Sequence, residues 1–334
     1  MGSARINITY YATIVNYLKH NAQCLESEIS SLDIHYKKTI ESLQKLYPAT
    51  PSPVVHFLGG SLPAPALLHL TQFSLLSMIS RLENSIILKH GLNILSSNPP
   101  PPKSWFTQVN SLCAQYSLPP ALSLLSQPLP KNPFKNKVKK AVFDFWEQKL
   151  RKDTSSLSSL KYFKSQFHSL SKPHLIWSSV GTNPYEVNKA VIQARMLSGR
   201  YRCEQLRRHW SNNPGYCELE PCFTQSVGGS LEHMLLDCRH CPALGECRQS
   251  FISLCQQKLE HNSYLKNIFV KYLDNNSIEN QAQFILDPSV LPDVIRLIQD
   301  KNNDAVNLIF YLTRTYCHSV HKTKMKLLGL CWSP

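Results

Sequence analysis

Apolar residues recur at spacings of three and four over most of this chain, which is the pattern of helices that bury one face. Residues 26–46 illustrate it, because Ile29, Leu32, Tyr36 and Ile40 fall on one side of an ideal helix. The same reasoning predicts helices over residues 8–18, 26–46, 65–94, 105–116, 134–153, 185–202, 244–259, 290–298 and 305–326. The alternation typical of β-strands is sparse. We therefore expect a mainly α fold.

Prolines mark where several of these helices begin or end. Asn98 and the four prolines after it stop one helix, and a second proline-rich stretch, residues 119–133, separates the helices before it from the helix at 134–153. Pro184 opens another helix after Asn183. With the charge and cysteine distributions described below, these breaks predict four regions. They are a helical domain at 1–130, a basic helical region at 131–216, a CCHC zinc knuckle at 217–244 and a C-terminal helical region at 245–334.

No stretch is apolar for long enough to predict a membrane-spanning helix. The densest, residues 66–79, is interrupted by polar residues such as His69 and Gln72, whereas a span requires about 18 apolar residues. The N-terminus lacks a cationic segment followed by an apolar block, and the eleven cysteines show no regular disulfide spacing. We expect an intracellular protein of the nucleus or cytoplasm that is neither secreted nor membrane-bound.

Positive charge is concentrated in one part of the chain. Lys and Arg exceed Asp and Glu by 36 to 22, and residues 131–216 contain 17 of those basic side chains against 5 acidic ones. Such a concentration favours nucleic acid as a partner, either RNA or DNA and preferentially single-stranded or structured RNA. The candidate contact residues lie just before the cysteine cluster and are Lys189, Arg195, Arg200, Arg202, Arg207, Arg208 and Trp210. Tyr201 and Trp210 either stack on unpaired bases or belong to the core, and the arginines alternatively form an ordinary polar face.

The most specific motif is Cys217-x4-Cys222-x10-His233-x4-Cys238. Three thiolates and one imidazole form the closed tetrahedral set that holds a structural Zn²⁺. Gly228-Gly229 gives the intervening loop freedom to return. His233 and Cys238 are separated by about 140° on an ideal helix, so both reach one metal only if the helix loosens near Asp237.

An alternative ligand set replaces His233 by Cys241. The spacing Cys217-x4-Cys222-x15-Cys238-x2-Cys241 is also typical of a four-cysteine zinc ribbon. His318 and His321, beside Lys322 and Lys324, offer at most half of a second site. For those histidines we expect a solvated terminal helix instead.

Motifs of common enzymes are missing from the sequence. The glycines form no dinucleotide-binding, P-loop or nucleophile-elbow pattern, and neither an H-E-x-x-H motif nor an Asp-Asp dipeptide occurs. The closest acid pair, Asp144 and Glu147, lies where Lys140 or Arg151 can neutralise it. We expect a protein that is not an enzyme and takes no small-molecule substrate.

Several short strings share their order with one family. They are Ala194-Arg-Met-Leu-Ser-Gly-Arg-Tyr-Arg202, His209-Trp210, Gly215-Tyr-Cys217, Leu231-Glu-His-Met-Leu235 with Cys238, and Cys241-Pro-Ala-Leu244. This series resembles the segment that follows the polymerase domain in non-LTR (LINE-type, jockey-like) retrotransposon reverse transcriptases of invertebrate animals, and the resemblance extends from near residue 8 to Gly329. In the family, Pro-Ala-Leu usually follows the closing cysteine directly, whereas here Arg239, His240 and Cys241 intervene.

The resemblance implies a thumb-like helical domain at residues 1–130 and a nucleic-acid-binding role. On this hypothesis the chain is the non-catalytic C-terminal part of a LINE-type reverse transcriptase and holds template RNA or target DNA. Any polymerase activity would belong to an upstream domain, because the palm carboxylates are missing here. The alternative hypothesis is a helical scaffold or interaction protein that zinc stabilises and that has no nucleic-acid role.

Overall fold

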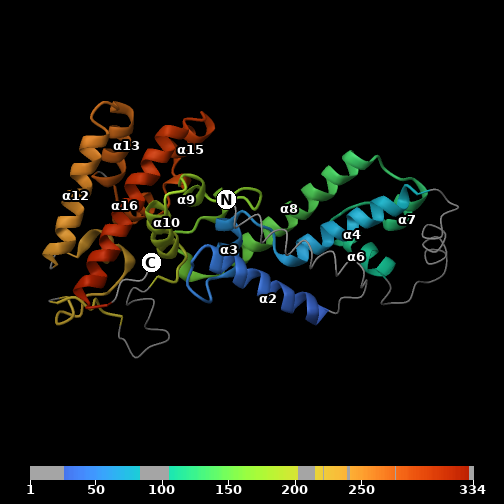
Figure 1. The fold of residues 1–334 in the computed structure, drawn as a ribbon, viewed down its shortest axis with the longest axis horizontal. Helices are drawn as coiled ribbons and strands as arrows, with labels where there is room; N and C mark the ends of the chain where they lie inside the picture. The colour runs from blue at the N-terminus through green and yellow to red at the C-terminus, as the bar shows by residue number, and fades with distance from the viewer. Residues whose placement is uncertain are drawn as a thin grey trace. The chain divides into compact units, whose positions relative to one another are not determined.

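The computed structural model describes residues 26–82, 105–201, 215–220, 222–238, 241–274 and 276–330. These residues are mainly helical (Figure 1), which confirms the fold class predicted from the periodicity. Within them, extended pairing is limited to one isolated antiparallel bridge between Tyr216 and Gly228. The helix predicted at residues 8–18, the end of the one predicted at 65–94 and the proline run at 98–102 lie outside the described ranges.

The chain forms two compact units. Unit 1 comprises Met1–Leu43 and Ser61–Lys152, and unit 2 comprises Gln44–Gly60 and Asp153–Pro334. The boundary predicted near residue 130 therefore falls inside unit 1. The physical reason is that the apolar stripe of helix α8 (Lys131–Ser155) is buried in that unit, where Trp146 donates a hydrogen bond from Nε1 to Tyr116 Oη at 2.9 Å.

Unit 1 is built around the ring of Tyr116. Its helices are α2 (Glu26–Leu43), α4 (Ala64–Ser80), α6 (Trp105–Gln115), α7 (Ala121–Ser126) and most of α8. The Tyr116 ring meets Phe73 and Phe145 edge-on, and its hydroxyl lies 2.6 Å from Nδ1 of His69. Trp146 donates to that hydroxyl, and burial lowers the pKa of His69 to about 4, which favours its neutral ring.

Unit 2 is organised around the long helix α16 (Asn303–Leu327), which packs against α10, α12, α14 and α15. The sequence predicted α10, α12, α15 and α16 but not α3, α9, α13 or α14. The helices of this unit are α3 (Ser52–Gly59), α9 (Leu175–Ser178), α10 (Pro184–Leu197), α12 (Pro242–Lys258), α13 (Ser263–Leu273), α14 (Ile278–Leu286), α15 (Pro292–Gln299) and α16, with short 3₁₀ turns at Ser158–Leu160, Ser165–Phe167 and Pro288–Val290. Pro184 and Pro292 each begin a helix, where a proline N–H is not needed.

The end of α16 is not the solvated helix that the sequence predicted. His318, His321 and Lys324 are all buried, His321 with 4% of its surface exposed. His321 contacts the buried Tyr201, whose hydroxyl lies 2.7 Å from His321 Nδ1. Sequence periodicity missed this because α16 packs on several neighbours at once, so polar residues also face inward.

Within the described ranges, no single helix combines the length and apolar character needed to cross a membrane. The bent pair α3 and α4 meets that test when its two helices are taken together.

Acid should destabilise unit 2 through His321. Burial, together with the positive charge of Arg195, lowers its pKa to about 4. In the unfolded chain a histidine has a pKa near 6.5, so the unfolded state binds more protons below that pH. The neutral His321 side chain therefore contributes its full stabilisation above about pH 6.5. This contribution to the free energy of unfolding, about 3 kcal/mol in total, is lost as the pH falls toward 4. Urea unfolding of wild type and His321→Gln between pH 7 and pH 4.5 measures this, because glutamine can still accept a hydrogen bond but does not titrate there. The difference in free energy of unfolding between wild type and His321→Gln should become smaller as the pH falls. If the two proteins lose stability in parallel, the lowered pKa is not that of His321.

Candidate metal centre

A short loop brings Cys217 and Cys222 together. The chain leaves Gly215 with a positive φ of 87°, and Cys217 N donates to Val227 O at 2.8 Å while Gly229 N donates to Gly215 O at 2.8 Å. Val227 N also donates to Cys222 O at 3.0 Å, which closes the turn. The chain therefore reverses between Cys217 and Val227, and Gly228 lies opposite Tyr216 on the returning segment.

The second half of the site lies on a π-helix, His233–Asp237. A π-helix closes hydrogen bonds from residue i to i+5 instead of i+4, so residues five apart come onto one side. This is the local loosening that the spacing of His233 and Cys238 required. His233 N donates to Ser230 Oγ at 3.0 Å, which fixes the start of the turn.

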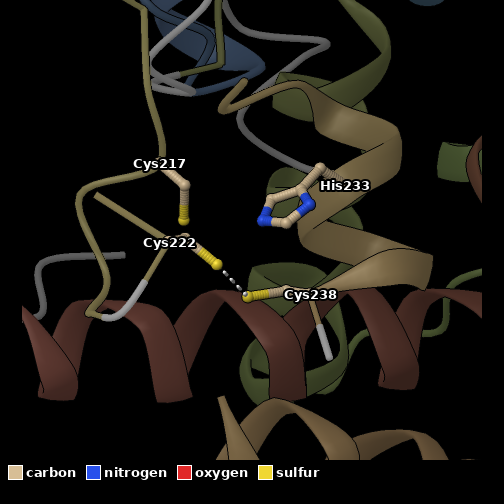
Figure 2. Close-up of side chains that lie close together, drawn as sticks. All are labelled: Cys217, Cys222, His233 and Cys238. Atoms are coloured by element: carbon tan, nitrogen blue, oxygen red, sulfur yellow. Dashed lines mark hydrogen bonds between the residues drawn. The ribbon is translucent and has the colours of Figure 1, made fainter. Parts of the chain in front are cut away.

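Cys217, Cys222, His233 and Cys238 form one cluster, called here the Cys3His cluster (Figure 2). One sulfur or ring-nitrogen atom from each lies within 4.8 Å of the others, and all four side chains are buried. Cys222 Sγ and Cys238 Sγ are 3.8 Å apart. A tetrahedral site with metal–sulfur bonds of about 2.3 Å places its sulfurs about 3.8 Å from each other. The four side chains therefore fit a tetrahedral metal ion.

The protonation of the cluster also fits a cation. The hydrogen bond from Cys238, more than the nearby His233, lowers the pKa of Cys217 to about 4, so that its thiolate is favoured. The same contact raises the pKa of Cys238, and burial raises that of Cys222, because further negative charge beside a thiolate is unfavourable. A bound dication would stabilise all three thiolates. His233 Nε2 is buried without a hydrogen-bond partner and points toward the sulfurs, so it is available as the fourth ligand (Figure 2).

The π-helix is held from outside by two helices of unit 2. The Tyr316 hydroxyl of α16 and Arg248 Nε of α12 both donate to Leu235 O, the latter at 3.1 Å. On the same turn, Glu232 accepts from Lys161 Nζ at 2.8 Å and from the Tyr162 hydroxyl. These contacts orient the turn that carries His233 and Cys238.

Cys241, the alternative fourth ligand, lies outside the cluster of mutually close ligand atoms. It is buried and sits at the N-cap of α12, where its carbonyl accepts from Leu244 N at 3.1 Å. The geometry therefore favours His233 over Cys241.

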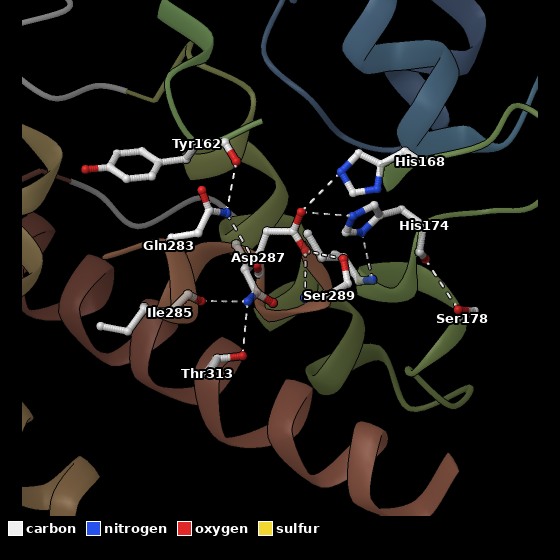
Figure 3. A network of polar contacts seen from close by, with 11 residues as sticks. Tyr162, His168, His174, Ser178, Gln283, Ile285, Asp287, Ser289 and Thr313 are labelled. Atoms are coloured by element: carbon white, nitrogen blue, oxygen red, sulfur yellow. Dashed lines mark hydrogen bonds and ion pairs between the residues drawn. The ribbon is translucent and has the colours of Figure 1, made fainter. Parts of the chain in front are cut away.

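A second buried group, which the sequence did not reveal, contains His168, His174 and Asp287 (Figure 3). Asp287 Oδ2 lies 3.2 Å from His168 Nε2 and 3.5 Å from His174 Nε2. Oδ1 of the same carboxylate accepts from Ser289 N at 3.2 Å and from Ser289 Oγ at 2.6 Å. More than a hundred residues separate the histidines from Asp287, so no spacing motif could have indicated this group.

Hydrogen bonding gives this second group a structural role. His174 Nδ1 accepts from Ile176 N at 3.1 Å, which leaves the proton of the neutral ring on Nε2, facing Asp287. A metal at Nε2 would require that proton to leave. Burial lowers the pKa of His174, only partly offset by Asp287. Burial alone would raise the pKa of Asp287, but the two histidines hold it well below its usual range. We interpret the group as an ionised carboxylate that joins α14 to the segment before α9.

The predicted nucleic-acid residues are not all exposed. Lys189 is 5% exposed, its Nζ is 2.7 Å from Glu186 Oε1, and it also lies over the ring of Tyr185. This burial is a correction to the prediction, because an ammonium group enclosed and paired in this way cannot reach a phosphate.

The remaining predicted contact residues divide into two groups. Arg195 is half-buried, donates from Nε to Lys45 O at 2.7 Å and stacks on Tyr47, and Arg200 is also half-buried. The others lie outside the described ranges and are Arg202, Arg207, Arg208 and Trp210. Of the acid pair, Glu147 behaves as predicted, since its Oε2 accepts from Arg151 Nη2 at 2.8 Å.

Comparisons with protein-family models, with curated proteins and with solved structures found no match for this chain.

Metal content should depend on the Cys3His cluster and not on Cys241. Cys222→Ser should lose the bound metal, measured by elemental analysis of purified protein, together with the local fold around residues 215–238. His233→Ala should weaken retention against a chelator, whereas Cys241→Ser should keep the wild-type stoichiometry. If Cys241→Ser loses metal and His233→Ala keeps it, the four-cysteine alternative is correct.

Asp287→Asn should destabilise unit 2 without changing the metal content. The amide group would place an N–H opposite the protonated Nε2 of His174 or would leave that nitrogen unpaired in the core, at a cost of about 3 kcal/mol. Urea unfolding and elemental analysis of the same preparation provide the two readouts. Loss of one metal equivalent at unchanged stability would identify a second metal site instead.

Proposed function

We propose that this chain is a non-catalytic nucleic-acid-binding protein that contains a structural zinc site. The observation that carries the proposal is the buried Cys3His cluster, which lies next in sequence to a strongly basic segment. Three cysteines and one histidine match zinc better than calcium or magnesium, which prefer oxygen ligands.

The zinc ion would be structural because the protein supplies all four ligands. A catalytic zinc keeps one position open for water or substrate. Here the four side chains are buried and enclose the tetrahedron. The ion would link the loop at Cys217 and Cys222 to the π-helix, and so fix the segment that joins α10 to α12.

The nucleic-acid role rests on charge and on the order of the sequence motifs. Residues 131–216 have a net charge of +12 and lead directly into the metal site. Zinc knuckles beside basic segments commonly bind single-stranded nucleic acid. The resemblance to the C-terminal part of LINE-type reverse transcriptases supports the same role, holding template RNA or target DNA, and no catalytic residue is proposed.

The alternative is a scaffold protein in which zinc only stabilises the helices. Two observations on α10 favour the scaffold hypothesis, namely the burial of Lys189 and the contacts of Arg195 with Lys45 and Tyr47. Both side chains already have intramolecular roles. The two hypotheses differ in whether the chain binds RNA or DNA at low salt.

Binding to single-stranded RNA should weaken steeply as salt increases. Each phosphate neutralised contributes about −0.7 to the slope of log K against log salt. Reversing Arg202, Arg207 and Arg208 to Glu should flatten that slope by about 2 if all three contact phosphates. Fluorescence anisotropy between about 50 mM and 300 mM salt measures it.

The matched control is Arg195→Gln with Lys189→Gln, which should leave the salt slope nearly unchanged because both side chains are engaged within unit 2. Circular dichroism would verify that the control and the triple variant remain folded. If wild type binds neither RNA nor DNA at about 50 mM salt, where phosphate contacts are strongest, the scaffold hypothesis replaces this proposal.

A further inference from the structure

Helix α8 presents the densest exposed group of positive charges in the described part of unit 1. The first ten residues of the helix, 131–140, include five exposed lysines: Lys131, Lys135, Lys137, Lys139 and Lys140. That stretch contains no acidic residue. None of the five lysines makes an ion pair with a described carboxylate, unlike Arg151 further along the helix. We call these five lysines the α8 lysine face; on an ideal helix Lys131, Lys135 and Lys139 lie along one line, and Lys137 and Lys140 project from the other side.

The apolar side of the same helix is occupied within unit 1. Phe134, Val138, Val142 and Trp146 are buried. A basic amphipathic helix binds a membrane by placing its apolar side among the acyl chains. Because these apolar side chains are covered, the exposed lysines are the part of α8 that is available to a partner. The chemistry offered is a row of ammonium groups, which binds phosphate oxygens.

We propose that the α8 lysine face binds the backbone of double-helical nucleic acid. This inference rests on the proposed nucleic-acid role and adds to it a surface in unit 1, separate in sequence from the metal site, and a class of partner. The charges sit on a rigid support, because Lys131, Lys135 and Lys139 follow one another at a spacing of one helical turn, about 6 Å.

Charge density favours a duplex over a single strand. From Lys131 to Lys140 the helix rises by about 14 Å, over which a duplex presents about eight phosphate charges and each of its strands presents half of them. A duplex is also already rigid, so that matching it to a fixed row of lysines costs little conformational entropy.

The side chains around these lysines also favour a duplex. Proteins that bind single strands stack exposed aromatic rings on the bases. On α8 no aromatic side chain is fully exposed, since Phe143 and Phe145 are half-buried and Trp146 is buried. Lys139 and Lys149 lie over the rings of Phe143 and Trp146, at 5.6 and 4.5 Å from the ring centres. The face therefore provides charge without a base-stacking surface, and binding should not depend on sequence.

The test compares two charge-reversed variants of the full chain. One carries Lys135→Glu, Lys139→Glu and Lys140→Glu on the α8 lysine face; the other carries Lys258→Glu, Lys266→Glu and Lys326→Glu at exposed positions of unit 2. Both change the net charge equally. The probes are a 20-base-pair DNA duplex, an RNA duplex and the unpaired strands of each, titrated over a range of salt. A Lys→Gln version of the α8 variant, checked by circular dichroism, covers the case in which reversal perturbs folding.

The α8 variants should bind duplex more than about tenfold more weakly at low salt, with a salt slope flatter by about 0.9 for each lost contact. The unit 2 variant should retain wild-type affinity and slope, and single-strand binding should change little in either. Equal losses in both variants, or a wild type that binds single strands but no duplex, would overturn this inference while leaving the proposed function intact. Absence of binding to every nucleic acid would instead overturn the proposed function, and this inference with it.

Discussion

The burial of α16 is the constraint on which unit 2 depends. A helix enclosed by four others must find a partner for each of its polar side chains, because an unpaired buried polar group costs about 1–3 kcal/mol. Each partner lies on a different segment. Arg314 reaches Glu186 of α10 at 3.3 Å and Ser179 O at 3.2 Å, while Tyr316 reaches Leu235 O on the π-helix and His321 reaches Tyr201. These contacts set the register of the surrounding chain against α16.

The Cys3His cluster follows from the same arrangement. Tyr316 and Arg248 hold the carbonyl of Leu235, which lies between His233 and Cys238. The π-helix thus turns both ligands to one side, and the loop closed by Cys217 and Val227 presents the two remaining sulfurs. The spacing along the chain decides which four residues can form the cluster. The packing of the π-helix against α12 and α16 then orients the side chains of His233 and Cys238.

The distribution of positive charge has a different physical origin in the two units. Lys189 and Arg195 belong to a segment of high net charge, yet one is buried beside Glu186 and the other stacks on Tyr47. The lysines of α8 contribute to the same total and remain in water, because that helix buries only its apolar stripe. Net charge by segment therefore measures the number of cations and not their accessibility.

The sequence by itself determined the helical class, most helix positions and three of the four candidate metal ligands, Cys217, Cys222 and Cys238, because these follow mainly from short-range spacing. Cys222 and His233 are further apart in the chain, and the loop that reverses between Cys217 and Val227 brings them together. Helices α13 and α14 were missed although both carry such a local signal, since each is amphipathic and follows a capping residue, Asn262 or Ser277. Only the tertiary structure decided that His321 and Lys189 are buried, that His233 rather than Cys241 completes the cluster, and that Asp287 meets His168 and His174. These outcomes depend on which helices surround a side chain, and that is set by packing between segments far apart in the chain.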